Sequence, residues 1–164
     1  MKPDIQAQGG PRPPSRAERL AAIRVSRRFR APPEQVFDAW LDPAVAGQWL
    51  FATAWRPMAR VAIDARVAGR FRFASRRGGS KHAHTGRYLE IDPPRRLVFS
   101  LSTAKRPRAV TRVSVELVPR DRGCELILTH EQLPPDHASH AKARWTGMLY
   151  GLGETLDRNG STQD

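Results

Sequence analysis

Cysteine is almost absent from the sequence, with Cys124 as its single example. One thiol cannot form an internal disulfide, and a cysteine-based zinc site needs further thiolate ligands. Cys124 precedes the leucines of a predicted strand, and we interpret it as a small buried residue, because a reactive thiol needs a cationic neighbour that the sequence does not place. A reducing, cytoplasmic location fits this composition.

Long apolar runs are also missing. No run approaches the roughly 18 residues that span a bilayer, and residues 1–19 have no apolar stretch of the kind found in a secretory signal. We interpret residues 1–19 as a disordered tail rich in proline and arginine. Residues 20–158 are expected to form a single domain, and residues 159–164 a frayed C-terminus.

Acidic residues are scarce: 16 Asp and Glu stand against 28 Lys and Arg, giving a net charge of +12. Twenty-four of the basic residues are arginine, and they form no long block. Arg70 and Arg72 alternate with Phe71 and Phe73, and in a strand this alternation predicts a solvated arginine face and a buried phenylalanine face. The pattern favours a solvated surface over a nucleic-acid patch, which is kept as an alternative.

Signatures of catalysis and of cofactor binding are absent as well. The sequence has no Gly-x-Ser-x-Gly motif and no glycine loop for phosphate, and it indicates no cofactor. His82 with His84, and His137 with His140, have spacings that a metal can use, but no carboxylate or cysteine supports them. We therefore favour exposed histidines over a metal site. A cyclase- or hydrolase-like enzyme stays open as an alternative.

What the sequence does contain is clear hydrophobic periodicity. Ile23, Val25 and Phe29 alternate with polar residues and predict a first strand, and Pro32 opens a helix that ends at Leu41. A second short helix is expected over residues 45–50. From about residue 58 the period changes to two, which predicts strands within 59–67, 68–75, 84–102 and 109–131.

The last predicted element is a long helix. Asp136 is its expected N-cap and Asn159-Gly160 its expected end, with an apolar stripe that includes Trp145, Met148 and Leu149. The fold class is therefore α+β: a curved antiparallel sheet of about six to seven strands around a long C-terminal helix, with two short helices after the first strand. Imperfect contact between a curved sheet and one helix leaves room for a cavity.

This order of elements resembles the helix-grip (START-like, Bet v-like) fold of the SRPBCC superfamily, in the branch of activators of heat-shock-protein ATPase. The resemblance covers about residues 22–157 and rests on "APPEQVFDAWLDP", "AGRFRF", "GRYLEIDPPRRLVFS", "VTRVSVELVP" and "CELILTHEQLP", in the family's order. The chain departs from the pattern at Leu50 and Phe51, where a second tryptophan is usual. It also has Ala68-Gly69 in place of a glycine pair, and Arg144 in place of a glycine before Trp145.

The resemblance implies a cavity between sheet and helix that binds a small, mostly hydrophobic molecule, and a real site of this kind is expected to measure about 300 Å³ or more. His130 shares a strand face with Leu126 and Leu128 and should point inward, either to orient a ligand or as a hydrogen-bonded structural residue. Gly147 and Gly151 indicate either close packing or room for a ligand. The expected lining is Trp49, Phe51, Phe71, Phe73, Tyr88, Phe99, His130, Trp145, Met148 and Leu149.

The alternative is a protein-interaction module that binds a chaperone or another acidic protein through its basic face or tail. The eukaryotic co-chaperones of this branch engage the chaperone through a further N-terminal domain, so chaperone activation is not carried over to this chain. Both a monomer and a homodimer are compatible with the sequence.

Overall fold

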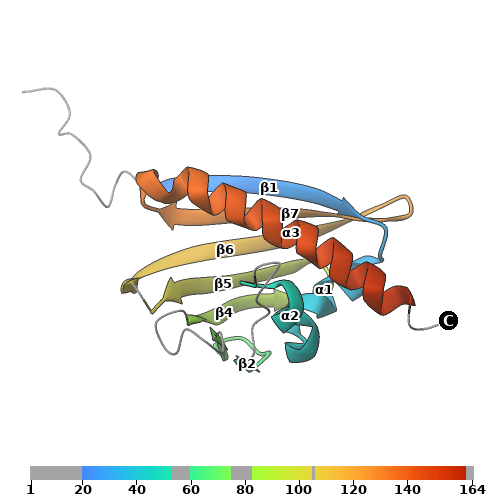
Figure 1. Ribbon diagram of the computed structural model, residues 1–164, viewed down its shortest axis with the longest axis horizontal. Coiled ribbons are helices and arrows are strands. Elements are labelled where there is room, and N and C mark those ends of the chain that lie inside the picture. The colour runs from blue at the N-terminus through green and yellow to red at the C-terminus, as the bar shows by residue number, and fades with distance from the viewer. Residues whose placement is uncertain (1–19, 53–59, 75–82, 105, 162–164) are drawn as a thin grey trace, which may run out of the picture.

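The computed structural model describes residues 20–52, 60–74, 83–104 and 106–161. In this part of the chain a curved antiparallel sheet of seven strands lies behind one long helix, and two short helices lie near the C-terminal end of that helix (Figure 1). The strands are β1 (Ala21–Phe29), β2 (Arg60–Ile63), β3 (Arg70–Ala74), β4 (His84–Asp92), β5 (Arg96–Thr103), β6 (Arg106–Arg120) and β7 (Gly123–Leu133). The helices are α1 (Pro33–Leu41), α2 (Pro43–Trp49), the 3₁₀ turn η2 (Pro135–His137) and α3 (Ala138–Ser161). The predicted α+β helix-grip architecture is confirmed.

The strand order is β1-β7-β6-β5-β4-β3-β2, and every neighbouring pair is antiparallel. The first strand of the chain therefore lies beside the last, and the second strand forms the opposite edge. The segment that contains α1 and α2 makes this crossing. From β2 to β7 each strand pairs with the next one along the chain, as the period-two runs predict.

Helix α3 crosses in front of the sheet from the β1–β7 edge toward α1 and α2 (Figure 1). Its inner stripe is almost fully buried: Trp145 is 2% exposed, and Leu149 and Leu152 are 0% exposed. Burying a leucine side chain contributes about 1.5–3 kcal/mol, so this stripe anchors the helix to the sheet. None of the described helices combines the length and hydropathy required to cross a bilayer.

The ends of the helices differ from the sequence prediction. Asp136 lies within η2, which is capped by Pro134 without a side-chain hydrogen bond, so Asp136 does not cap α3. The helix also continues through Asn159 and Gly160 to Ser161, because Gly160 keeps a helical conformation and does not adopt the left-handed one that ends helices.

The second short helix begins earlier than predicted. Helix α2 starts at Pro43, and the Oδ1 atom of Asp42 accepts a hydrogen bond of 3.0 Å from the N–H of Ala44. A proline at the first helical position and an aspartate before it are both favoured at helix starts. Pro43 therefore opens α2 as well as ending α1.

Strand β2 is shorter than the alternation predicts. Val67 is 60% exposed and Ala65 is also exposed, because the chain turns back after Ile63. The N–H of Gly69 donates to the carbonyl of Arg66 at 2.8 Å within this turn. A Cβ atom on Gly69 would lie 2.2 Å from the Asp64 carbonyl oxygen, so the turn requires glycine here. A continuous strand to Val67 was therefore a wrong prediction.

A β-bulge interrupts β7 near its end. Ala21 pairs with Leu133 while Ile23 pairs with His130, so β7 carries an additional residue at this point. Gln132 adopts a left-handed conformation with φ 66° and is exposed. The bulge shifts the alternation by one residue, so that both His130 and Leu133 face the interior. This local change shapes the end of the sheet where the site lies.

Candidate functional site

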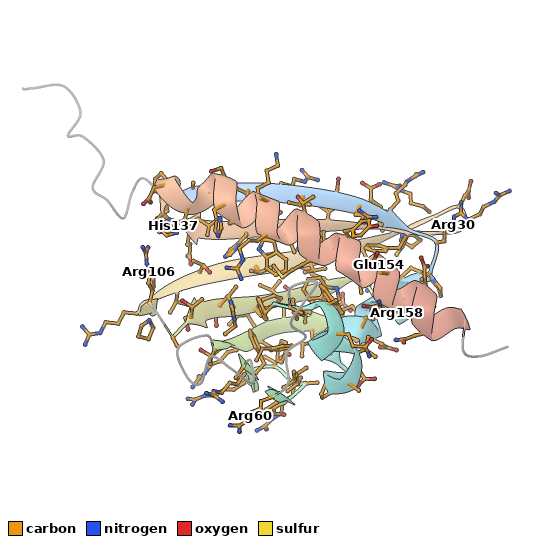
Figure 2. The ribbon with its side chains drawn as sticks, in the orientation of Figure 1. Arg30, Arg60, Arg106, His137, Glu154 and Arg158 are labelled. Atoms are coloured by element: carbon orange, nitrogen blue, oxygen red, sulfur yellow. The ribbon has the colours of Figure 1, made fainter. Side chains whose placement is uncertain are left out.

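A pocket with a volume of about 160 Å³ lies where α3 begins. It is enclosed by the first turns of α3, the start of β6 and the ends of β5 and β7. Figure 2 shows two of its residues, His137 in η2 and Arg106 at the start of β6, at the same end of the molecule. The lining residues are Phe51, His84, Leu101, Ser102, Thr103, Arg106, Ala109, Thr111, His130, Leu133, Pro134, His137, His140, Ala141, Arg144, Trp145 and Met148.

The floor of the pocket is apolar. Its buried members are Phe51, Leu101, Leu133, Trp145 and Met148, each no more than 8% exposed. Phe51 follows α2, Leu101 and Leu133 come from β5 and β7, and Trp145 and Met148 come from α3. Segments far apart in the sequence therefore meet at the floor. Apolar side chains at this depth offer a ligand burial without hydrogen bonds.

The rim is polar and basic. Arg106 and Ala109 from β6 and His140 and Arg144 from α3 are exposed, and His137 is half-buried. Ser102 and Thr103 from β5 also line the pocket, and the hydroxyl of Ser102 shares a hydrogen bond of 3.2 Å with that of Thr85. The described part of the lining has no aspartate and no glutamate. The pocket is therefore apolar inside and basic at its opening.

His130 is held on the pocket wall by a directed chain of hydrogen bonds. The indole Nε1–H of Trp145 donates to Nδ1 of His130 at 2.9 Å. An indole nitrogen only donates, so Nδ1 carries no proton and the neutral ring is protonated on Nε2. Nε2–H then donates to Oγ1 of Thr111 at 2.8 Å, and the Thr111 hydroxyl donates to the carbonyl of Leu101 at 3.1 Å.

This environment keeps His130 neutral. Burial, reinforced by the positive charge of Arg144, lowers the pKa of His130 from 6.5 to about 4. Both ring nitrogens are hydrogen-bonded to protein groups, so neither is free to bond a ligand. The prediction that His130 points inward is confirmed, with the side chain 6% exposed.

Phe51 occupies an unusual backbone position at the pocket. Its φ of 58° is left-handed, a conformation that costs a bulky residue about 1–3 kcal/mol. Its ring stacks on His84 with centroids 4.4 Å apart and planes 9° apart, and its N–H donates to Sδ of Met148 at 3.2 Å. Contacts from β4 and α3 therefore hold the strained residue in place.

Six of the ten residues expected to line the cavity lie in the hydrophobic core instead of on the pocket surface. Four of the ten, Phe51, His130, Trp145 and Met148, are brought together at the pocket. The six core residues are Trp49, Phe71, Phe73, Tyr88, Phe99 and Leu149.

Contacts between rings join the aromatic members of this group to the rest of the core. Trp49 donates from Nε1 to the carbonyl of Ala39 at 3.1 Å and meets Trp40 edge-on at 4.6 Å. Phe71 lies 5.4 Å from Phe99 and 5.3 Å from Tyr88, measured between ring centroids. Burial raises the pKa of Tyr88, as expected for a phenol inside the core. The aromatic rings thus interlock where the cavity was expected.

The pocket at the start of α3 is smaller than the 300 Å³ expected and lies toward one end of the fold. The glycines of α3 do not create it: a Cβ atom on Gly147 would meet nothing within 4 Å, and one on Gly151 would be 3.8 Å from Cβ of Trp49. Close packing instead requires Gly86 of β4. A Cβ atom there would lie 1.8 Å from the Ser100 carbonyl oxygen and 2.5 Å from Cζ of Phe71.

Comparison with known proteins identifies the family. Residues 30–157 match the family model described as activator of Hsp90 ATPase homolog 1-like protein. The chain belongs to this AHSA1-like family. A search of curated proteins gives no match.

Solved structures share the AHSA1-like fold. The protein CV1439 of Chromobacterium violaceum is 29% identical, with a TM-score of 0.70 over 81% of this chain and 94% of that one. A protein of Rhodobacter sphaeroides is 25% identical, with a TM-score of 0.70 over 93% of this chain and 97% of that one. The AHSA1-like protein of Aeromonas hydrophila is 22% identical, with a TM-score of 0.73 over 85% of this chain and 94% of that one.

Within this AHSA1-like fold, sequence reasoning missed the basic rim. Arg144 was noted as a departure from the family pattern but not as a site residue, and Arg106 was not singled out. His84, His137 and His140 were weighed as metal ligands, whereas the structure places all three on the pocket. His82 lies outside the described residues. Within the described ranges, no group of three or more His, Cys, Asp or Glu side chains is arranged to hold a metal ion.

Proposed function

We propose that this AHSA1-like protein binds a small, mostly hydrophobic molecule in the pocket at the start of α3. The observation that carries the proposal is the combination of an apolar, buried floor with an exposed rim in a cavity of about 160 Å³. An engineered cavity of about 150 Å³ holds benzene. The apolar part of the ligand is therefore about the size of one aromatic ring or a short branched chain.

In this proposal the protein binds the molecule and carries out no covalent chemistry on it. An acid–base catalyst needs a free nitrogen or oxygen within reach of the reacting atoms. Both nitrogens of His130 are already hydrogen-bonded to Trp145 and Thr111. Affinity then comes from burial of apolar surface at the floor. A cytoplasmic location and a single domain over residues 20–158 belong to the same proposal.

Tryptophan fluorescence tests it, because the indole of Trp145 lines the floor. Titration with a panel of single-ring and short-chain apolar compounds should change the tryptophan emission, and the change should saturate as the compound concentration rises. Ala141→Leu adds bulk to a half-buried lining residue and should abolish the response. Ala143→Leu is the matched control, since Ala143 is exposed on the same helix and lies outside the lining. No response from any compound, and no co-purified molecule in native mass spectrometry, would refute binding.

A second candidate function is interaction with an acidic protein, a chaperone among them. Arg70 and Arg72 of β3 and Arg87 of β4 are exposed on the outer face of the sheet, with Arg70 directly opposite Arg87. None of the three has an ion-pair partner among the described residues. Neighbouring like charges on paired strands destabilise a sheet, and an acidic partner would relieve this repulsion.

Pull-down experiments distinguish this interaction from pocket binding. Capture of an acidic protein should be lost on Arg70→Gln/Arg72→Gln/Arg87→Gln and at high salt, and persist in Ala141→Leu. Deletion of residues 1–19 shows whether the tail contributes. A nucleic-acid filter assay is the counter-test, because binding with a steep salt slope would identify a nucleic acid as the partner instead.

A further inference from the structure

The charged groups around the pocket indicate what kind of ligand it accepts. Arg106 comes from β6 and Arg144 from α3, so the two guanidinium groups approach the opening from different elements. Both side chains are exposed, and neither forms an ion pair within the part of the chain that the structure describes. They are therefore available to a charged group at the rim.

Among the described residues, no carboxylate in the lining competes for these arginines. Asp136 directly precedes the rim residue His137 in sequence, is exposed, and places Oδ2 3.6 Å from Nε2 of this half-buried histidine. Glu131 points to the opposite face of β7 from His130, because successive side chains of a strand alternate. The opening therefore has an excess of positive charge.

The charge of Arg144 also acts on the pocket wall. The positive charge of Arg144 contributes to the lowered pKa of His130, after the larger effect of burial. A charge that disfavours a second positive charge on the wall favours a negative one in the same space. Thr103 and Thr111 also line the pocket, and the hydroxyl of Thr103 can donate a hydrogen bond to an anion.

We propose that the ligand is a small organic anion whose negative group binds Arg106 and Arg144 at the rim while its apolar part, about the size of one aromatic ring, fills the floor. This proposal rests on the proposed function. It adds the charge of the ligand, which neither the fold nor the family membership specifies. The guanidinium group suits a carboxylate, because its planar set of N–H donors matches the two carboxylate oxygens.

The test compares matched pairs of compounds that differ only in charge: phenylacetate with phenylacetamide, and 3-phenylpropionate with its amide. Two partly exposed ion pairs should give the carboxylate about tenfold tighter binding at low salt. Arg106→Gln/Arg144→Gln should reduce the affinity for the carboxylate to that for the amide. Arg108→Gln is the matched control, because Arg108 is exposed on β6 and does not line the pocket.

The outcomes separate the two proposals. Preference for the carboxylate that is lost in the double variant and kept in Arg108→Gln supports the anionic ligand. Equal binding of carboxylate and amide overturns it and leaves pocket binding intact. If neither the carboxylate nor the amide binds, and Ala141→Leu responds to the panel of apolar compounds as the parent protein does, the pocket function is refuted. This inference is then refuted with it.

Discussion

Acidification should destabilise this protein through His130 in particular. The ring is neutral in the folded state, where its pKa is about 4, and an unfolded chain returns it to about 6.5. Above pH 6.5 the ring is neutral in both states and its full contribution is present. As the pH falls below 6.5, the unfolded state gains a proton that the folded state does not take up, so stability is lost until about pH 4.

The magnitude follows from the difference between these two pKa values. One pKa unit corresponds to about 1.4 kcal/mol, so the complete loss between pH 6.5 and pH 4 is about 3 kcal/mol. Between pH 7 and pH 5, above the range where most carboxylates titrate, the loss is about 2 kcal/mol. Small domains are typically stable by about 5–15 kcal/mol, and a change of this size is readily measured.

Urea unfolding at steps from pH 7 to pH 5 is the assay, with His130→Gln as the matched variant. A glutamine amide offers one acceptor for Trp145 and donors for Thr111, and it does not titrate. The comparison uses the slope of stability against pH and not the absolute stability, so a constant cost of the substitution does not disturb it. The other histidines and all the carboxylates are present in both proteins and cancel in the difference.

The parent protein should lose about 2 kcal/mol more than His130→Gln over this interval. Parallel curves for the two proteins would refute the argument, because they would mean that His130 takes up its proton equally in the folded and unfolded states. Nitrogen chemical shifts of the imidazole give an independent check: the ring should stay neutral and protonated on Nε2 down to pH 5.

Four further predictions concern packing, the protonation of His130 and the reactivity of Cys124. Gly86→Ala should destabilise the domain by more than about 3 kcal/mol in chemical unfolding, because its Cβ atom would overlap the backbone of the adjacent strand. Gly147→Ala should stabilise it by up to ~1 kcal/mol, since its Cβ atom meets open space in a helix; equal effects of the two substitutions would contradict the packing described. Trp145→Phe should raise the pKa of His130 in an NMR titration, because the hydrogen bond that favours the neutral ring is lost. Cys124 is 1% exposed and its pKa is raised by burial and by Glu34, so a thiol reagent should label it only after unfolding, and fast labelling of the native protein would count against this placement.

The architecture could be predicted from the sequence because its signals are local. Alternation in β1 marks Ile23 and Val25 as buried, and the stripe of α3 marks Trp145 and Leu149. Each pattern lies within a single strand or helix and shows which face of that element is buried. Their order along the chain then limits the fold to a sheet and a single long helix.

The pocket could be predicted only in part, because it depends on how several elements meet. The sequence indicates that Phe71 and Phe99 face inward, but not that their rings fill the space between sheet and helix. It does not show that α3 leaves the beginning of β6 accessible, which makes Arg106 a rim residue. The bulge at Gln132 also escapes a period-two pattern, although it determines that Leu133 faces the pocket.

The pairing of β1 with β7 has a consequence for how the molecule is made. Among the described strands β1 comes first along the chain, yet its hydrogen-bonding neighbour is β7, which comes last. During synthesis the backbone of β1 has no partner strand, and its apolar side chains stay exposed, until β7 has been made. We expect this pairing to close over a long chain separation and therefore to form more slowly than a hairpin, and an unpaired strand edge favours aggregation until it does.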